Sequence, residues 1–300
     1  MSTDTKRQHY VWRAYLRSWS HNDKIFFKRG DIIAKTSLMN VGHRKVFYRL
    51  SELSNIEKEF IFDSIHKIAP SDISSLFDDI QFDLELLEFT NSHPESFNQD
   101  YIEKDYNNYD QYIERYHGII ENYGKNLIKC RSLFSLNKCV HEEGILNIMI
   151  FLFVQYYRTN AIKEAFVNDK VFEADKKILS KTWNILSFCI AIVEAYNSSN
   201  KKLRFKFLVN KTKQSFITGD QPIFNHLNTH FKKCSHDVEL YYPLSPQYAL
   251  LVKFNETNGD QISEMVLDEA AVHYFNKKII DFSSEFIFSN NDESLCVYKE

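Results

Sequence analysis

The sequence is poor in the two residue types that interrupt regular structure, with 7 glycines and 5 prolines among 300 residues. Their scarcity argues against a turn-rich β-sandwich and favours long helices. Large side chains are abundant instead, since 25 Phe and 17 Tyr contribute to a hydrophobic fraction of 44%. This composition is ample for a sizeable buried core.

Cysteine is also scarce, and its pattern excludes a disulfide framework. The five cysteines are an odd number with wide spacing and no CxxC pair (Cys130, Cys139, Cys189, Cys234 and Cys296). They predict reduced thiols in a cytoplasmic protein. The opening residues MSTDTKRQHY lack the apolar core of a signal peptide. The longest apolar run, Ile145–Val154, is too short to cross a bilayer and predicts a buried helix, so we expect no membrane association.

Several catalytic motifs are missing as well. The sequence contains no GxxxxGK[ST], GxGxxG, HExxH or GxSxG pattern, which disfavours a P-loop NTPase, a Rossmann dehydrogenase and an α/β-hydrolase. It also lacks, in its long helices, the R-x4–6-H pattern of helical ribonucleases.

The net charge of −3 conceals two oppositely charged segments. Residues 1–50 hold eleven Lys/Arg against three Asp, a balance of +8, whereas residues 51–124 hold seventeen Asp/Glu against four Lys/Arg, a balance of −13. The basic residues 6–49 can meet the phosphates of a nucleic acid. Alternatively, they dock on the acidic segment of the same chain, and the remaining charges form solvated faces.

Hydrophobic periodicity predicts an α+β fold. Helical spacing covers residues 8–19, 54–68, 71–89, 101–123, 136–167, 171–196 and 267–282, with Ser54 or Asn55 as a cap. Strand patterns cover residues 24–28, 32–37, 203–207, 214–218, 239–244, 248–254, 286–288 and 295–298, while 46–50 forms a strand or a loop. We therefore expect one domain over 1–300, in which an N-terminal hairpin and C-terminal strands form one sheet and the middle forms a helical layer. Its parts are a basic helix and hairpin (1–50), a helical region (51–197) and a strand-rich region (198–300).

Four stretches, in order along the chain, resemble one family. They are QHYVWRAYL (residues 8–16), QYYRT (155–159), FITGDQP (216–222) and PLSP (243–246), the last followed by a strand and Asn276. Together they are similar to the domain of unknown function 4238 family, found mainly in bacteria. Trp12 replaces the proline usual after HYV, and Gly219 replaces a serine. The resemblance implies no established activity, and it points towards proteins of mobile elements and defence loci.

The first motif supplies His9 and Arg13 as catalytic candidates, with Gln8 and Tyr10 as substrate-binding neighbours. On a predicted helix His9 and Arg13 share one face, where a histidine moves protons and an arginine holds a phosphate or carboxylate. The alternative is structural: His9 bonds the core and Arg13 pairs with an acidic helix.

Arg158 and Asp220 are the other catalytic candidates, flanked by Gln155 and Thr218 as substrate-binding residues. Arg158 follows an apolar helix, so it needs a partner, either a substrate anion or a structural carboxylate. Asp220 follows a strand, where a carboxylate can act in catalysis or hold a divalent metal, and where Asp is also a favoured turn residue. An Arg158–Asp220 ion pair is the simplest structural account of both.

Two further groups of histidines are weaker candidates. His43, in a basic loop, joins His9 at a phosphate site or lies on the surface. His226, His230, Cys234 and His236 are residue types that bind zinc, but their spacing matches no standard zinc module, so we assign no metal site.

Two functions follow from these candidates. The first is an enzyme acting on nucleic acid or another phosphodiester, such as a nuclease-like toxin or phage-defence effector, with His9 as acid or base, Arg13 and Arg158 stabilising the phosphate, and Asp220 orienting His9 or holding a metal. The second is a non-catalytic binding or regulatory module in which the same residues are structural, with a protein partner or a second copy of the chain.

Overall fold

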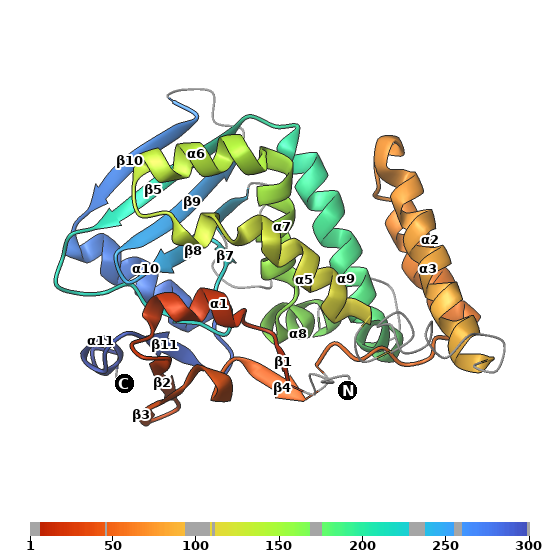
Figure 1. Ribbon diagram of the computed structural model, residues 1–300, viewed down its shortest axis with the longest axis horizontal. Coiled ribbons are helices and arrows are strands. Elements are labelled where there is room, and N and C mark those ends of the chain that lie inside the picture. Colours follow the sequence, from red (N-terminus) through yellow and green to blue (C-terminus); the bar gives the residue numbers. More distant parts are fainter. Residues whose placement is uncertain are drawn as a thin grey trace.

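A computed structural model describes residues 7–45, 47–93, 109, 112–168, 176–227, 238–254 and 260–298. Figure 1 shows strands from both ends of the chain at one side of the molecule and helices from its middle at the other. The predicted α+β fold, with an N-terminal hairpin, C-terminal strands and a helical middle, is confirmed. The prediction of one sheet was wrong, because the described strands form three sheets.

A four-stranded sheet joins the two ends of the chain. The hairpin β2 (Lys24–Arg29) and β3 (Ile32–Ser37) turns at Gly30, whose φ of 55° suits glycine. β11 (Ile287–Ser289) pairs antiparallel with both β2 and β6 (Thr218–Gly219), giving the order β3-β2-β11-β6. A strand from near the end of the described chain therefore lies between the N-terminal hairpin and the FITGDQP motif.

A five-stranded sheet comes from the C-terminal region alone. Its order is β10-β5-β9-β8-β7, from β5 (Leu203–Asn210), β7 (Phe224–Asn225), β8 (Glu239–Ser245), β9 (Tyr248–Phe254) and β10 (Ile262–Leu267). Alternate residues of β8 point to opposite sides: Leu240 and Tyr242 join the main core, whereas Tyr241 joins a second core beneath α10 (Glu269–Phe282). The sheet is therefore covered on both faces, which accounts for its mostly buried central strands.

The helical layer begins with α5 (Tyr112–Gly124) and η5 (Leu127–Lys129), followed by α6 (Leu133–Glu143), α7 (Ile145–Tyr157), α8 (Asn160–Asn168) and α9 (Lys176–Ser199). The predicted single helix over 136–167 is three helices: Gly144, with a φ of 79°, separates α6 from α7, and residues 158–159 separate α7 from α8. α9 is long and apolar enough to cross a membrane by composition, yet 67% of its most apolar window is buried inside the protein. It packs on α7 as a core helix.

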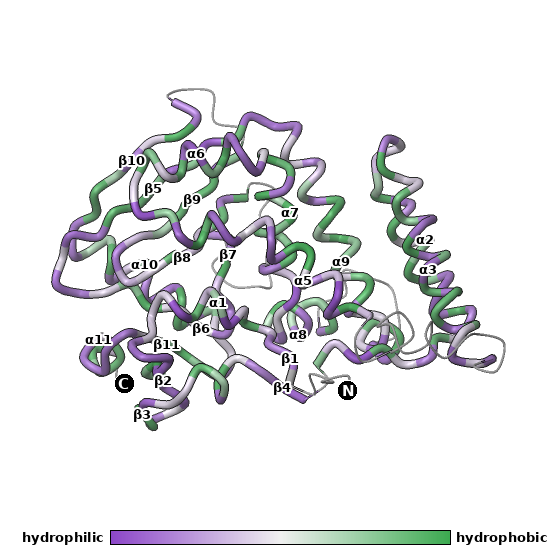
Figure 2. The backbone as a smooth tube through the Cα atoms, viewed as in Figure 1, coloured by the Kyte–Doolittle hydropathy of each residue, from purple (hydrophilic) through white to green (hydrophobic). Residues whose placement is uncertain are grey.

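A helical arm packs on α9 at one side of the body. It comprises α2 (Asn55–His66), η3 (Ser71–Ile73) and α3 (Ser74–Ser92). Ser54 caps α2 in a capping box with Glu57, as the sequence predicted for Ser54. Figure 1 shows α2 and α3 side by side at the edge of the molecule, and Figure 2 shows hydrophilic and hydrophobic segments alternating along both.

The N-terminal segment differs most from its prediction. The expected helix over 8–19 is a short strand β1 (Arg7–His9), one helical turn α1 (Arg13–Leu16) and η1 (Arg17–Trp19). β1 pairs with β4 (His43–Lys45), which follows η2 (Leu38–Asn40) where a loop was expected, and residues 47–50 form no strand. Tyr10, Val11, Tyr15 and Trp19 are buried, so their helix-like spacing reflects burial from several directions rather than one helical face.

Two predictions at the C-terminal end were also wrong. Residues 295–298, expected as a strand, lie in and after the short helix α11 (Glu293–Cys296). Residues 262–267 form β10, which pairs parallel with β5; no strand was predicted here, and Leu267 was placed at the start of the helix over 267–282. Only Thr218 of the predicted strand 214–218 belongs to a strand, β6. Of the predicted helix over 101–123, residues 101–108, 110 and 111 lie outside the described part of the chain.

Candidate functional site

His9 and His43 face each other across the β1–β4 ribbon. They are directly opposed in its register, which places their side chains on the same face. Their ring centroids are 5.5 Å apart in an edge-on arrangement. Of the two alternatives left open for His43, the structure therefore shows the one in which it lies beside His9, and the cause is the pairing of two strands that the sequence did not reveal.

The His9 imidazole is held in its neutral form. Burial lowers its pKa from 6.5 to about 4, and His43, Arg13 and Arg158 add to this effect because nearby positive charge disfavours a second one. The Nε2 atom of His9 is buried and has no hydrogen-bond partner among the described residues. A neutral ring with an unsatisfied nitrogen can accept a proton or receive a hydrogen bond from a bound group.

Arg13 does not share a helical face with His9, contrary to the prediction, because the helix begins only at Arg13. Its exposed side chain donates to the sulfur of Met39. It still lies close enough to lower the pKa of His9. The exposed Lys45 is two residues beyond His43 in β4, so strand alternation places it on the same face as the two histidines.

Arg158 is the centre of a buried polar cluster behind β1. Its side chain is 2% exposed and forms an ion pair of 2.9 Å with Glu121 of α5. Nε donates to the Tyr48 hydroxyl at 2.8 Å, and Nη2 donates to the backbone carbonyl of His9. The predicted Arg158–Asp220 pair is wrong, since Arg158 uses its donors to bind α5 and to fix the position of His9.

Three residues of α5 belong to this cluster and were missed as candidates. Burial raises the pKa of Glu114 to about 7, while Arg158 opposes that rise. Burial also raises the pKa of Glu121 and lowers that of His117 well below its usual range. Their spacing of three and four residues puts them on one helical face, a signal that was present in the sequence.

Gln8 and Gln155 are both buried near this cluster. Gln8 accepts a hydrogen bond from the backbone N–H of Tyr48 at 2.6 Å, which ties β1 to the segment after β4. Gln155 is 2% exposed, and its Nε2 has no partner among the described residues. The fixed position of Gln8 argues for a structural role, whereas Gln155 retains a donor that is not used within the described chain.

Asp220 is bound by a loop rather than directed at His9. One carboxylate oxygen accepts from the Ser284 N–H at 2.8 Å, and the other accepts from the N–H groups of Glu285 and Phe286 at 2.7 and 3.0 Å. The Ser284 hydroxyl adds a fourth bond. Burial raises the pKa of Asp220, although these hydrogen bonds act in the opposite direction. With four donors in place, Asp220 organises the 283–286 loop.

Hydrogen bonds join the family-like motifs to one another. Thr218 shares a bond of 2.6 Å with the Tyr15 hydroxyl, and Thr159 donates to Gln221. The Trp19 indole donates to the Phe216 carbonyl, and Asn276 bonds the backbone on both sides of Phe216. Tyr10 is buried against Phe47, with the Arg44 guanidinium over its ring. Thr218 and Tyr10 therefore fasten the FITGDQP and QHY segments into the fold.

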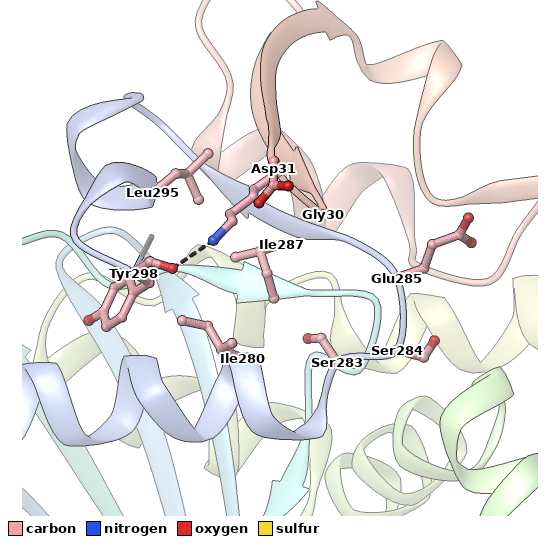
Figure 3. A pocket seen from close by; sticks show the side chains of 10 residues that line it. Gly30, Asp31, Ile280, Ser283, Ser284, Glu285, Ile287, Leu295 and Tyr298 are labelled. Atoms are coloured by element: carbon pink, nitrogen blue, oxygen red, sulfur yellow. Dashed lines mark hydrogen bonds between the residues drawn. The ribbon is translucent and has the colours of Figure 1, made fainter. Parts of the chain in front are cut away.

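A cavity of about 350 Å³ is lined in part by the Asp220-binding loop. Figure 3 shows Ser283, Ser284 and Glu285 along one wall, with Asp31 at the hairpin turn and Tyr298 opposite. The Lys28 amine donates to the backbone carbonyl of Tyr298 at 2.6 Å. The lining includes none of the candidate catalytic residues, so the histidine pair and this cavity are separate features.

No group of three or more His, Cys, Asp or Glu side chains suited to a metal ion occurs in the described ranges. Of the four possible zinc ligands, only His226 is described, and its ring lies against Tyr274 and Phe275. His230, Cys234 and His236 lie outside the described residues.

Comparison with known proteins gives one result. A family model described as protein of unknown function (DUF4238) matches residues 7–293. No curated protein and no solved structure matches the chain. The match contains all four motifs and both histidines of the β1–β4 ribbon, and the chain belongs to the DUF4238 family.

Proposed function

We propose that this protein is a phosphodiester-acting enzyme, with nucleic acid as its substrate class, and that His9 and His43 carry out its proton transfers. The observation that carries the proposal is the opposed His9–His43 pair, in which a neutral imidazole has an unsatisfied buried nitrogen. Buried polar atoms without partners are uncommon in folded proteins, and a catalytic role is one of the explanations for such an atom.

The proposed reaction needs one base and one acid. His9 takes the proton of the attacking water or hydroxyl, a new P–O bond forms, and the bond to the leaving oxygen breaks as His43 returns a proton to it. A bound phosphate would raise the pKa of His9 towards neutrality, because a nearby negative charge favours the imidazolium form. The exposed Arg13 and Lys45 provide positive charge beside the pair.

Arg158 and Asp220 take different roles from those first assigned. Arg158 is a positioning residue, since it binds the His9 carbonyl and is itself neutralised by Glu121. Asp220 is a structural residue, because its oxygens are occupied by the 284–286 backbone. Whether a divalent metal takes part is tested in the assay rather than assigned to a residue.

The test is cleavage of labelled RNA, single-stranded DNA and duplex DNA by the full chain, with and without Mg²⁺ or Mn²⁺. We expect His9→Ala and His43→Ala each to reduce the rate by about 100-fold or more, as for loss of an acid or base. His141→Ala is the matched control, since His141 is exposed on α6. Cleavage that survives both substitutions, or its absence in folded wild-type protein on every substrate, would refute the proposal.

A non-catalytic binding or regulatory module is the second candidate. It is favoured by the saturation of Arg158 and Asp220, which leaves two of the four predicted catalytic residues with structural contacts. Its signature is a sharp fall in melting temperature for both His9→Ala and Asp220→Ala, with no cleavage by the wild type. A His9→Ala variant that melts like wild type but has lost cleavage would decide for the enzyme.

The oxidation state of the cysteines is a guide to the cellular compartment of the protein. Cys130, Cys139 and Cys189 are free and buried, and Cys296 is free and exposed. Free thiols suit a reducing compartment, and we propose the cytoplasm.

A further inference from the structure

Two of the buried cysteines lie side by side between η5 and α6. Cys130 directly follows η5, and Cys139 lies on α6. The thiol of Cys130 donates to the backbone carbonyl of Asn126 at 3.4 Å. Its sulfur also accepts a hydrogen bond from the thiol of Cys139. The two sulfur atoms are therefore in contact, although the cysteines are not a CxxC pair.

The N-terminal end of α6 holds the two thiols together. Ser135 and Cys139 are four residues apart, so they lie on one face of the helix. The Ser135 hydroxyl oxygen accepts from the backbone N–H groups of Arg131 and Ser132, both at 3.0 Å, as part of the capping box of α6. These bonds fold the chain that follows Cys130 back towards the face that carries Cys139.

The two thiols differ in how readily each loses its proton. The hydrogen bond from Cys139 lowers the pKa of the Cys130 thiol; burial opposes this shift, while the Ser135 hydroxyl and the Arg131 guanidinium reinforce it. The same bond raises the pKa of Cys139, and burial adds to that rise. Because the thiolate is the nucleophilic form of cysteine, Cys130 is the more reactive of the two.

The pair lies just below the surface of the protein. Cys130 and Cys139 are each 2% exposed, but their sequence neighbours Arg131 and Lys138 are exposed. Cys189, by contrast, is completely buried in the core helix α9, and burial raises its pKa to about 12. A small oxidant therefore needs only a local opening to reach the pair, whereas reaching Cys189 requires the core itself to open.

We propose that Cys130 and Cys139 form an oxidant-responsive pair, which a hydroperoxide converts into a reversible intramolecular disulfide. The Cys130 thiolate attacks one peroxide oxygen: an S–O bond forms, the O–O bond breaks, and the departing oxygen takes up the proton that Cys130 lost. The Cys139 sulfur then attacks the Cys130 sulfur: the S–S bond forms, the S–O bond breaks, and hydroxide leaves with the Cys139 proton as water. The two thiols give up two electrons and two protons, which reduce the hydroperoxide to water and an alcohol or a second water.

The disulfide would cross-link the chain around the start of α6. Disulfide sulfurs are about 2 Å apart, so thiols that are already in contact need little movement to form the bond. The bond closes the segment 130–139 and restricts the unfolded chain, so the oxidised protein should melt at a higher temperature than the reduced protein. In a reducing compartment, thiol–disulfide exchange reverses the linkage.

The experiment is treatment of the folded full chain with hydrogen peroxide, followed by alkylation of the remaining thiols and peptide mapping by mass spectrometry. The wild type is expected to show a Cys130–Cys139 link with the loss of two hydrogen atoms. Dithiothreitol should reverse both the link and the rise in melting temperature. If both thiols stay reduced while the exposed Cys296 is oxidised, or if the link forms only in denatured protein, the proposal is wrong.

Serine variants separate the roles of the two thiols. Cys130→Ser and Cys139→Ser should each abolish the link and the shift in melting temperature, whereas Cys296→Ser, the matched control, should form the link like wild type. Cys139→Ser should accumulate a sulfenic acid on Cys130, detected with dimedone. In Cys130→Ser, Cys139 should react with peroxide about tenfold more slowly than Cys130 does in the wild type. Equal reactivity of the two thiols would overturn the assignment of Cys130 as the attacking residue. All of these results are independent of any cleavage activity.

Discussion

At the scale of single residues, Gly219 shows what a departure from the family pattern does. A Cβ at this position would lie 1.9 Å from the Ser283 hydroxyl oxygen and 3.1 Å from both the Ser283 Cβ and the Phe286 carbonyl. The absence of a side chain allows the 283–286 loop to approach closely enough to bond Asp220. Glycine is required here for space, not for an unusual backbone angle.

The substitution Gly219→Ser, which restores the residue usual in the family, is therefore expected to destabilise this protein. Overpacking of this kind costs about 1–3 kcal/mol. The measurement is urea-induced unfolding, with Gly118→Ser as the control, because a side chain at Gly118 meets nothing within 4 Å. Equal stability of the two variants would show that the loop moves aside without cost.

His9 supplies a second prediction, in the pH dependence of stability. Its pKa falls from 6.5 to about 4 on folding, so the folded state binds fewer protons than the unfolded state between these values. The neutral ring's stabilising contribution is complete above pH 6.5 and is lost as the pH falls to 4. Between pH 7 and pH 5 the wild type should lose about 1 kcal/mol more unfolding free energy than His9→Gln, with solvent screening of the half-buried ring taken into account. Parallel profiles for the two proteins would contradict the buried, neutral state.

At the scale of elements, the contact between α5 and the end of α7 contains a group of buried titratable residues that were not among the predicted site residues. Glu114, His117 and Glu121 face Arg158, a single cation, from one side of α5. Arg158 forms its ion pair with Glu121, and the Oε2 atom of Glu114 is buried without a partner among the described residues. Glu114 is therefore the carboxyl that holds a proton near neutral pH.

Replacing Glu114 by Gln should stabilise the protein at alkaline pH. The pKa of Glu114 is raised to about 7. The contribution of its protonated form to the unfolding free energy is therefore fully present below about pH 4.5 and is lost as the pH rises through 7. At pH 8.5 we expect Glu114→Gln to have a higher melting temperature than wild type, corresponding to about 2 kcal/mol more unfolding free energy. At pH 5 the two proteins should differ little. Glu121→Gln is the contrasting variant, expected to be destabilised at both pH values because it removes the partner of a buried cation. A pH-independent effect of Glu114→Gln would exclude the protonated state.

Elements set by local signals were predictable, and those set by distant contacts were not. The Ser54–Glu57 capping box and the alternation of apolar and charged residues over 203–207 are local patterns, and α2 and β5 begin where the sequence placed them. β1 and β4 are three residues each and exist only because they pair with each other. The His9–His43 contact depends on that register. Both residues were therefore candidates from the sequence, although the strand pairing that brings them together was not predicted.

The remaining site residues show the same limit. Arg158 was expected to need either a substrate anion or a structural carboxylate. It pairs with a carboxylate, but seventeen acidic residues in 51–124 offered no way to choose Glu121. Asp220 was correctly placed after a strand, yet its partners are backbone N–H groups of a loop 64 residues away, and no side-chain pattern predicts such a contact.

Trp12 has a φ of −56°, a value that the family's usual proline also adopts, so the substitution leaves this backbone angle intact.

At the scale of the whole molecule, β11 makes the four-stranded sheet depend on both ends of the chain. Phe288 is fully buried at its centre, opposite Phe27 of β2 and Thr218 of β6. Phe288→Ala should therefore cost about 3–5 kcal/mol, as for other buried Phe-to-Ala changes. Amide hydrogen exchange should accelerate in β2 as well as β11, although more than 250 residues separate them. Faster exchange confined to residues 287–289 would show that the hairpin is stable without β11.

The position of β11 also sets an order of events during synthesis. Translation proceeds from the N-terminus, so the β2–β3 hairpin leaves the ribosome long before the strand that covers its inner edge. Until residues 287–289 emerge, the nascent chain exposes the backbone edge of β2 and the side chain of Phe27, which is the kind of surface that chaperones bind and that pairs wrongly with other chains. Ribosome-bound chains stalled before β11 should thus remain protease-sensitive within residues 24–37 and become resistant only after the last strand has entered the sheet.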